Sequence, residues 1–315
     1  MSRPYVRRRA QDNSWWYMGH LSTVLAMPED TDGSMGVFDV TIRAGMEPPP
    51  HVHSREVEAI FLLDGYLEGF AGNQRLCAGP GELVNLPMNQ PHGWKITAGN
   101  DGVSARGLVI AVPGAFGHYF RRFSEPCEKL ALPDVNNNAY QAKMQADIGG
   151  MIADAAEFGI EWMPPGYMPP TLQTLPARPA CLNVLGEQFQ PLALSGETGG
   201  HYAAMIWTSP AQSQLPCHRH EDADEAFYVL EGRIAIQTED DFWVIAEPGD
   251  FVFLPRGVAH RHNAAGGAPA RAFQLLTPGG VEGGLAEVAA LPPQEINFPA
   301  LAEIAERYRL TLLPG

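Results

Sequence analysis

Residues 51–65 read HVHSREVEAIFLLDG, and residues 218–232 read HRHEDADEAFYVLEG. Both stretches contain two histidines one residue apart, a glutamate after a gap of four residues, and a later glycine. A second block repeats as well, because GELVNLPMNQPH at 81–92 recurs as GDFVFLPRGVAH at 249–260. A repeat that spans about half of the chain is too long for a solenoid unit and predicts two copies of one domain.

The bulk composition is that of an ordinary globular protein, with 45% hydrophobic and 18% charged residues. The net charge is −15, from 21 Lys+Arg against 36 Asp+Glu, which argues against nucleic acid and against anionic membranes as partners. The N-terminus has no apolar signal core, and no apolar run reaches the roughly 18 residues of a membrane span. The four cysteines form no CxxC pair, so free thiols in a cytoplasmic protein are expected.

Short apolar stretches separated by turn residues fill both halves of the chain. With 33 Gly and 28 Pro, this pattern predicts an all-β fold of barrels or sandwiches. Asp64-Gly65 and Glu231-Gly232 lie where tight hairpin turns are expected. Helices are expected at 140–157, with Met144, Ile148 and Ile152 on one face, and near 298–310. The proline-rich segment at 167–180 predicts a boundary between domains at 1–166 and 167–315.

The histidines and glutamates of the repeat form a pattern that is typical of metal ligands. Alternate residues of a strand face the same side, so the two histidines of each HxH pair point the same way. Each copy adds a glutamate and a later histidine, which gives three imidazoles and one carboxylate. The predicted ligands are His51, His53, Glu58 and His92 in the first copy and His218, His220, Glu225 and His260 in the second. This donor set suits Fe, Ni, Mn, Co, Cu or Zn, with up to two ions per chain.

An isolated HxH pair is more often part of an ordinary core than a metal site. The complete order of HxH, Glu, Gly and a final His, found twice in register, favours metal binding over coincidence. Four protein ligands would leave two positions of a six-coordinate metal open for substrate or dioxygen, whereas a four-coordinate structural zinc would use them all. The sequence leaves open whether both copies are active.

The two blocks resemble the two signature motifs of the cupin superfamily, and their recurrence resembles a bicupin. The resemblance implies two jelly-roll (double-stranded β-helix) barrels, each with a metal site inside and a short helical segment after it. Where the motif usually has Gly before the last histidine, this chain has Asn89 in the first copy and keeps Gly257 in the second. These departures affect turn positions and leave the ligands intact.

Within the cupins, the gap before the glutamate, the chain length and the segment VPGAFGHYFRRFSEP at 112–126 resemble the two-domain quercetin 2,3-dioxygenases. This resemblance implies a metal-dependent dioxygenase that opens an enol-type aromatic ring, such as that of a flavonol like quercetin or of a polyketide-like analogue, with O2. Metal binding would acidify the enol hydroxyl, and Glu58 would serve as ligand, as base, or as both in turn.

The surroundings of the ligands predict that the first copy carries the chemistry. Trp94 lies two residues after His92, and Ile60 lies two after Glu58, so both are expected beside the metal as substrate-binding residues. The counterparts in the second copy are His262 and Phe227. The reading of Trp94 as ordinary barrel core stays open.

Two other classes of function remain as alternatives. One is a non-oxidative bicupin metalloenzyme, namely an isomerase, cyclase or decarboxylase that uses the metal as a Lewis acid, with oxalate decarboxylases as a specific rival. The other is a storage or binding bicupin, against which two intact ligand sets argue. The expected partners are a small enolic or aromatic substrate and O2, and a homodimer stays open.

Overall fold

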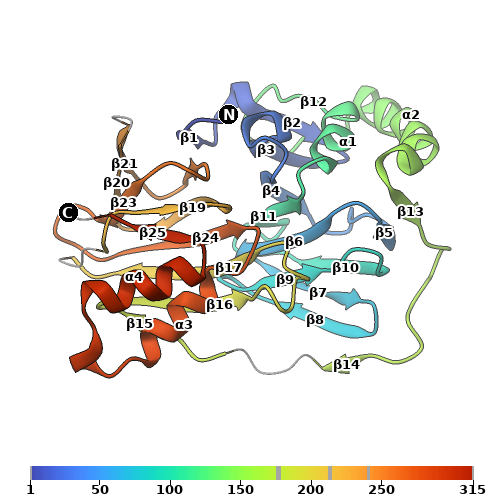
Figure 1. The fold of residues 1–315 in the computed structure, drawn as a ribbon. Coiled ribbons are helices and arrows are strands. Elements are labelled where there is room, and N and C mark those ends of the chain that lie inside the picture. The colour runs from blue at the N-terminus through green and yellow to red at the C-terminus, as the bar shows by residue number, and fades with distance from the viewer. Residues whose placement is uncertain (1, 175–178, 212–214, 240–241, 314–315) are drawn as a thin grey trace. The chain divides into compact units, whose positions relative to one another are not determined.

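The computed structural model describes residues 2–174, 179–211, 215–239 and 242–313. Short strands hold more of these residues than helices do, which confirms the predicted all-β class (Figure 1).

Contacts within the chain group it into two units, residues 9–177 and residues 1–8 together with 178–315. The first residues join the second unit because β1 (Tyr5–Arg8) pairs with β22 (Asp250–Leu254). The chain beyond residue 166 stays with the first unit as far as β14 (Gln173–Thr174), which pairs with β8 (Gln74–Ala78). This grouping differs from 1–166 and 167–315 in these two segments, and part of the expected linker, 175–178, lies outside the described residues.

The first unit consists of two sheets that enclose one apolar core. The larger sheet has the order β12-β2-β3-β4-β11-β6-β9, with the bounds Glu125–Pro126, Ser14–Tyr17, His20–Ala26, Gly36–Arg43, Ser104–Val112, Val57–Asp64 and Leu83–Leu86. The smaller sheet has the order β13-β5-β10-β7-β8-β14, with the bounds Ile160–Trp162, His51–His53, His92–Thr97, Tyr66–Ala71, Gln74–Ala78 and Gln173–Thr174. The printed pairings are antiparallel except that of β14 with β8.

The second unit repeats this topology. Its larger sheet has the order β1-β22-β19-β24-β17-β16-β15, with the bounds Tyr5–Arg8, Asp250–Leu254, Asp224–Glu231, Ala270–Thr277, Ala203–Ser209, Glu187–Ala193 and Leu182–Val184. Its smaller sheet has the order β21-β20-β23-β18-β25, with the bounds Trp243–Ala246, Ile234–Thr238, His260–Ala264, His218–His220 and Leu310–Leu312. The strands that carry the repeated motifs occupy equivalent places in both units, which confirms the two copies of one jelly-roll domain.

Hydrophobic alternation and hairpin turns explain the pairs of sheets. Strands β6 and β19 point alternate apolar side chains, Ile60 and Leu62 in one and Phe227 and Val229 in the other, into the core between the two sheets of their own unit. At the end of β6 the chain reverses at Gly65, which has φ +79° and leaves no room for a Cβ, since that atom would lie 2.9 Å from the oxygen of Thr97. Gly232 has φ +70° at the equivalent turn after β19, as the sequence predicts.

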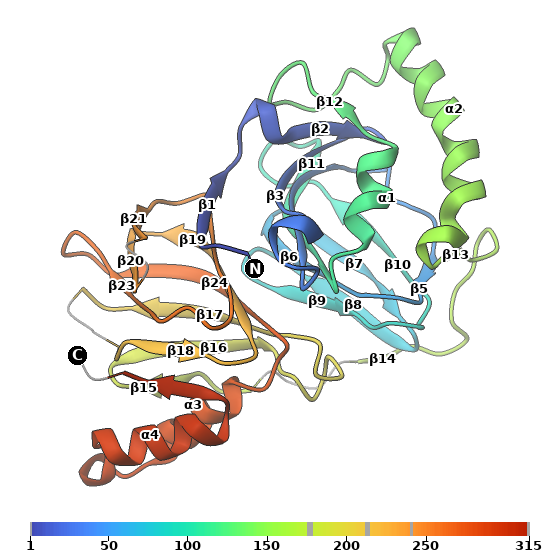
Figure 2. The same ribbon diagram turned by 45° about the horizontal axis from the view of Figure 1, so that its top comes forward.

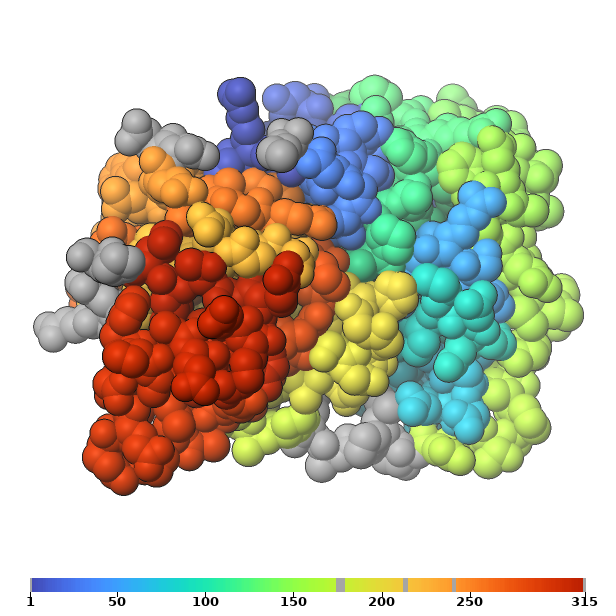
Figure 3. All heavy atoms as spheres, in the orientation of Figure 1, coloured from blue at the N-terminus to red at the C-terminus, as the bar shows by residue number. Residues whose placement is uncertain are grey.

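Helices follow the last long strand of each unit. They are α1 (Phe116–Arg122), α2 (Asn138–Asp154), α3 (Glu282–Ala290) and α4 (Phe298–Arg307), with short 3-10 turns at Gln11–Asn13, Pro28–Asp30, Ala155–Phe158 and Pro293–Glu295. Figure 2 shows α1 and α2 beside the sheets of the first unit and α3 and α4 beside those of the second. In Figure 3, α4 and β25, in red, form much of the visible face of the second unit.

The structure confirms the two predicted helices and shows what α2 packs against. The side chains of Asn137 and Asn297 accept hydrogen bonds from backbone amides in the first turns of α2 and α4, which fixes where these helices begin. In α2 the buried residue is Met151, whereas Ile148 and Ile152 are 39% and 61% exposed. The face that carries Ile148 and Ile152 therefore borders a cavity and does not pack against a continuous core.

Candidate metal centres

The first ligand group, which we call site one, consists of His51, His53, Glu58 and His92. Strands β5 and β10 are neighbours in the smaller sheet and place His51 directly opposite His92. Glu58 reaches the same point from β6 in the larger sheet. One ligand atom from each of the four residues lies within 4.8 Å of the others, and all four residues are buried.

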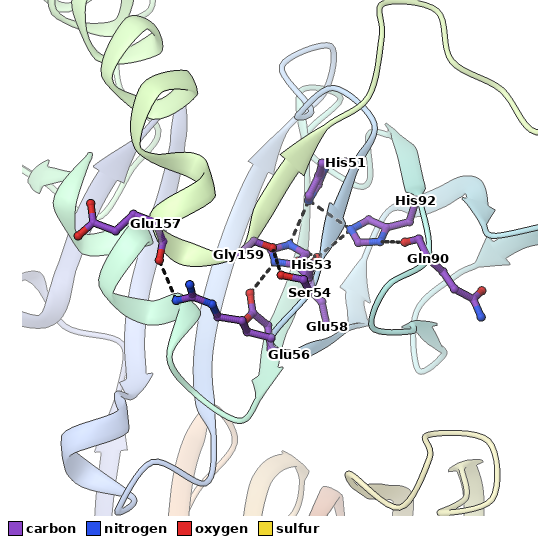
Figure 4. Close-up of polar contacts among 10 residues, drawn as sticks. His51, His53, Ser54, Glu56, Glu58, Gln90, His92, Glu157 and Gly159 are labelled. Carbon is purple, nitrogen blue, oxygen red and sulfur yellow. Dashed lines mark hydrogen bonds and ion pairs between the residues drawn. The ribbon is translucent and has the colours of Figure 1, made fainter.

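The outer ring nitrogens of the three histidines are held by hydrogen-bond acceptors, and Figure 4 shows those of His53 and His92. The Nδ1 atom of His51 lies 2.9 Å from the oxygen of Pro49, and that of His92 lies 3.2 Å from the oxygen of Gln90. The Nδ1 atom of His53 lies 2.6 Å from a carboxylate oxygen of Glu56. Since these partners are acceptors, each Nδ1 carries a proton, and each ring is oriented to offer its Nε2 to a metal ion.

The three Nε2 atoms converge on one point. The Nε2 of His51 lies 3.2 Å from the Nε2 of His53 and 3.2 Å from that of His92. The Oε2 atom of Glu58 lies 3.5 Å from the Nε2 atoms of both His53 and His92. Three imidazole nitrogens and an ionised carboxylate that converge in a buried space are the donors that a divalent transition metal takes, so the residues present fit such an ion.

The electrostatics of site one agree with this fit. Burial and the neighbouring His92 and His53 lower the pKa of His51 to about 3, so its ring is neutral. Burial would lower the pKa of His53, but contacts with Glu56 and Glu58 outweigh it and raise the pKa to about 9. Burial would raise the pKa of Glu58, yet the contacts with His53 and His92 hold it well below the usual range. Glu58 is therefore an ionised carboxylate, and a metal that binds here displaces a proton from His53.

The second ligand group, site two, consists of His218, His220, Glu225 and His260, on strands β18, β19 and β23. His218 lies opposite His260, as His51 lies opposite His92. The Nδ1 atoms of His218 and His260 lie 3.0 Å from the oxygens of Pro216 and Val258, so these two rings are oriented as in site one. The Oε2 of Glu225 lies 2.8 Å from the Nε2 of His260. Site two can therefore also hold a metal ion.

Two contacts distinguish site two from site one. Gln274 on β24 donates a hydrogen bond of 2.5 Å to Oε1 of Glu225, and in the first unit the equivalent position on β11 is Val109. The Nδ1 atom of His220 has no hydrogen-bond partner among the residues that the structure describes. Burial would raise the pKa of Glu225, but His220 and His260 hold it well below the usual range.

A cavity of about 540 Å³ opens at site one. It is lined by His51, His53 and Glu58 and by apolar and aromatic side chains from β2, α1, α2, β10 and β13, among them Tyr17, Trp94, Phe116, Tyr119, Met151 and Trp162. Trp94 lies in this wall. Ile60 is fully buried in the core and is not among the described residues that line the cavity, because its side chain packs between the sheets.

The cavity at site two is smaller, at about 110 Å³. Side chains of α3, α4 and β25 fill the equivalent space, including Leu285, Leu301, Ile304 and Leu312. His262, the counterpart of Trp94, lies in its wall. Burial lowers the pKa of His262 to about 4, so this additional imidazole is neutral.

Sequence reasoning missed three residues around the two sites. Glu56 lies between two predicted ligands but gave no signal of its own, because acidic residues in turns are usually exposed. Trp162 reaches site one only because β13 returns to pair with β5, where it faces His51 with ring centroids 5.3 Å apart. Gln274 lies within an otherwise apolar strand, and a polar residue at a core-facing position of such a strand is the feature that could have identified it.

No helix among the described residues is long and apolar enough to cross a membrane. The four cysteines are free, and Cys217, next to His218, is not part of the ligand group.

Comparison with known proteins agrees with this geometry. The cupin domain family matches twice, over residues 38–111 and 205–276, and each match contains one HxH pair and its glutamate. A quercetin 2,3-dioxygenase of Bacillus subtilis is 24% identical over 279 residues, which cover 82% of this chain and 78% of the relative.

Solved structures of oxalate decarboxylases share the fold. That of Bacillus subtilis superposes with a TM-score of 0.57 at 13% identity over 99% of this chain and 88% of its own. That of Lactobacillus farciminis superposes with a TM-score of 0.56 at 14% identity over 88% and 87%. The chain thus carries two cupin domains, each built around a His3Glu metal-binding group, and is a bicupin.

Proposed function

We propose that this bicupin is a metal-dependent dioxygenase that acts at site one on an enol-type aromatic compound, namely a flavonol or a polyketide-like analogue. The observation that carries the proposal is the cavity of about 540 Å³ that leads to an intact ligand group. Pockets for ligands of this size usually measure roughly 300–1,000 Å³ and are mostly apolar. The similarity to a quercetin 2,3-dioxygenase over most of both chains supports the same reaction class.

The cavity wall favours a planar, uncharged ring over a small dianion. Aromatic side chains and prolines make up much of the lining, and the described lining residues include no lysine or arginine. A dicarboxylate such as oxalate would meet the metal but no lysine or arginine among the described lining residues to balance its two charges. A ring with hydroxyl and carbonyl groups would instead bury apolar area against these side chains.

A metal bound at site one would supply Lewis-acid chemistry that acidifies the substrate's enol hydroxyl. Glu58 is ionised, lines the cavity and has no counterpart of Gln274 to hold its carboxylate. It is therefore available to take the proton when the hydroxyl O–H bond breaks. The resulting electron-rich enolate is the form of such a substrate that reacts with O2.

Two tyrosines in the same wall stay protonated. Burial, together with Tyr119 and Glu58, raises the pKa of Tyr17 well above its usual value. Burial and Asp154 raise the pKa of Tyr119 to about 12, and its hydroxyl donates a 3.0 Å hydrogen bond to the oxygen of Met151 in α2. Neither phenol competes with Glu58 for the substrate proton. The hydrogen bond from Tyr119 ties α1 to α2, and both helices help to exclude water from the cavity.

Oxygen consumption tests the proposal directly. The metal-loaded protein is mixed with a panel of flavonols and other enolic aromatics in an oxygen electrode, and products are analysed by mass spectrometry. We expect O2 uptake in proportion to substrate consumed, with two oxygen atoms incorporated from labelled O2. The variant His51→Ala with His53→Ala serves as the control and should consume no oxygen.

The same assay decides against the main alternative, a non-oxidative bicupin isomerase, cyclase or decarboxylase. Conversion of an enolic compound without O2 uptake, or release of CO2 from oxalate at the rate of a true substrate, would replace the dioxygenase proposal with the Lewis-acid one.

A further inference from the structure

Glu56 is a second carboxylate at site one that the donor set does not include. It lies in the turn between β5 and β6, and its side chain is buried. One of its oxygens lies 2.6 Å from Nδ1 of His53, on the side of the ring away from the other ligands (Figure 4). Its Oε2 atom has no hydrogen-bond partner among the described residues. Burial of a charged carboxylate costs free energy unless the group is paired. The contact with the ring of His53 is the pairing that Glu56 has, which links the two residues.

The turn that carries Glu56 is fixed to the segment that leads into β13. Both the backbone amide and the hydroxyl of Ser54 donate to the oxygen of Gly159, at 2.8 and 2.9 Å. The guanidinium of Arg55 donates to the oxygen of Glu157 at 2.7 Å. Ser54 and Arg55 are thus fixed to the segment before β13, and β13 itself pairs with β5. This restricts the carboxylate of Glu56 to one position relative to His53.

Site two contains a natural control for this contact. The residue equivalent to Glu56 is Ala223, which is buried and offers no acceptor side chain. His220, the counterpart of His53, accordingly has an Nδ1 atom without a partner in the part of the chain that the structure describes. The other two histidines of each site keep equivalent carbonyl partners. The two sites therefore differ in the partner of the third histidine and share the orientation of the other two rings.

We infer that Glu56 is a positioning residue that fixes the ring of His53 and makes site one retain its metal ion more firmly than site two. A carboxylate on the outer nitrogen holds the tautomer and the ring orientation and increases the electron density on the nitrogen that binds the metal. Removal of such a partner typically lowers metal affinity about 10–100-fold. The inference concerns metal retention and does not depend on the proposed oxidation.

The test measures the release of Co²⁺ from each site separately. Site one is isolated in the His218→Ala, His220→Ala background, and release is followed with excess chelator together with the visible absorption of the bound Co²⁺. We expect Glu56→Ala to accelerate release roughly 10–100-fold and to alter the Co²⁺ spectrum. Glu56→Gln, which keeps an acceptor oxygen but not the charge, should lie between. Glu161→Ala removes an exposed carboxylate from neighbouring β13 and should leave both readouts unchanged.

The reciprocal change completes the test in the His51→Ala, His53→Ala background. Ala223→Glu gives His220 the missing partner and should slow Co²⁺ release from site two. Thermal melting of each metal-free variant identifies any that fail to fold. A folded Glu56→Ala protein with unchanged release and an unchanged spectrum would overturn the inference. So would equal release rates from the two sites of the unmodified chain.

Discussion

Site one and site two have the same four ligands in the same register, yet they differ in what lies around them. At site one the space in front of the ligands measures about 540 Å³, and at site two it measures about 110 Å³. Behind the ligands, His53 has a carboxylate partner that His220 lacks. Glu225 accepts a hydrogen bond from Gln274, while the equivalent neighbour of Glu58 is apolar.

The difference shows that the ligand set and the reactive space are specified by separate parts of each domain. The ligands come from strands whose register both units share. The space comes from the helices and the last strand, where β13 contributes Ile160 and Trp162 and β25 contributes Leu310 and Leu312. Both sites can bind a metal, but only site one has room for a ring-sized substrate.

The largest expected effect comes from removal of the paired histidines. His51→Ala with His53→Ala should remove one metal ion per chain and abolish turnover, because site one then lacks two of its four ligands. His218→Ala with His220→Ala should remove the other ion and leave most of the turnover. Elemental analysis of both variants, with oxygen uptake measured alongside, checks this. Metal losses that do not follow these pairs would contradict the assignment of the ligands.

The next largest effect concerns the two glutamates. Glu58→Gln keeps the shape and an oxygen donor but removes the charge that accepts the substrate proton, and a positioned base is typically worth about 10²–10⁴ in rate. Turnover should therefore fall at least roughly 100-fold, whereas Glu225→Gln should affect it much less. Rates are compared per bound metal ion, because a lost carboxylate ligand can also lose the ion. If Glu225→Gln abolishes turnover and fully metallated Glu58→Gln does not, site two is the catalytic one.

A smaller effect is expected when site one is given the hydrogen bond of site two. Val109→Gln places an amide where Gln274 lies in the other unit, so that it can donate to Glu58. A hydrogen bond to a charged group contributes about 1.5–3 kcal/mol, so a donor that must be released before Glu58 takes a proton should slow turnover roughly 10–150-fold. Val109→Leu is the apolar control. If Val109→Gln and Val109→Leu turn over equally at matched metal content, a hydrogen-bond donor to Glu58 does not impair its role in catalysis.

The strand register explains why the ligands could be predicted from the sequence. The spacing of His51 and His53 places both on one face, and the repeated blocks bring His92 beside them through a regular antiparallel pairing. The turns at Gly65 and Gly232 were equally predictable, because their positive φ values favour glycine. Asn89, in place of the usual glycine, keeps a positive φ of 61° at its turn. Local rules were sufficient for these features.

The features that separate the two sites depend on long-range packing and could not be predicted. Trp162 enters the cavity because a strand about 110 residues further on returns to pair with β5. The small volume at site two results from how α4 packs, which the periodicity of α4 does not reveal. The sequence places Ile148 and Ile152 on one face of α2 but does not reveal that this face borders a cavity and remains partly exposed. The role of Glu56 depends on burial, which a turn sequence does not indicate.

The smallest expected effect is that of metal removal on the fold itself. Each unit has its own apolar core between its sheets, with Phe38 and Ile60 in one and Trp207 and Phe227 in the other, and none of these residues is a ligand. Circular dichroism at room temperature should therefore be unchanged after chelation. The melting transition should stay cooperative and shift down by roughly 5–10 °C, as expected for loss of a ligand that binds only the folded state. Site one should account for more of this shift than site two, since its histidine with the carboxylate partner binds the ion more firmly. Complete unfolding by chelator would instead show that each unit depends on its own metal as a structural ion, because only a fold without a sufficient core depends on its metal in this way.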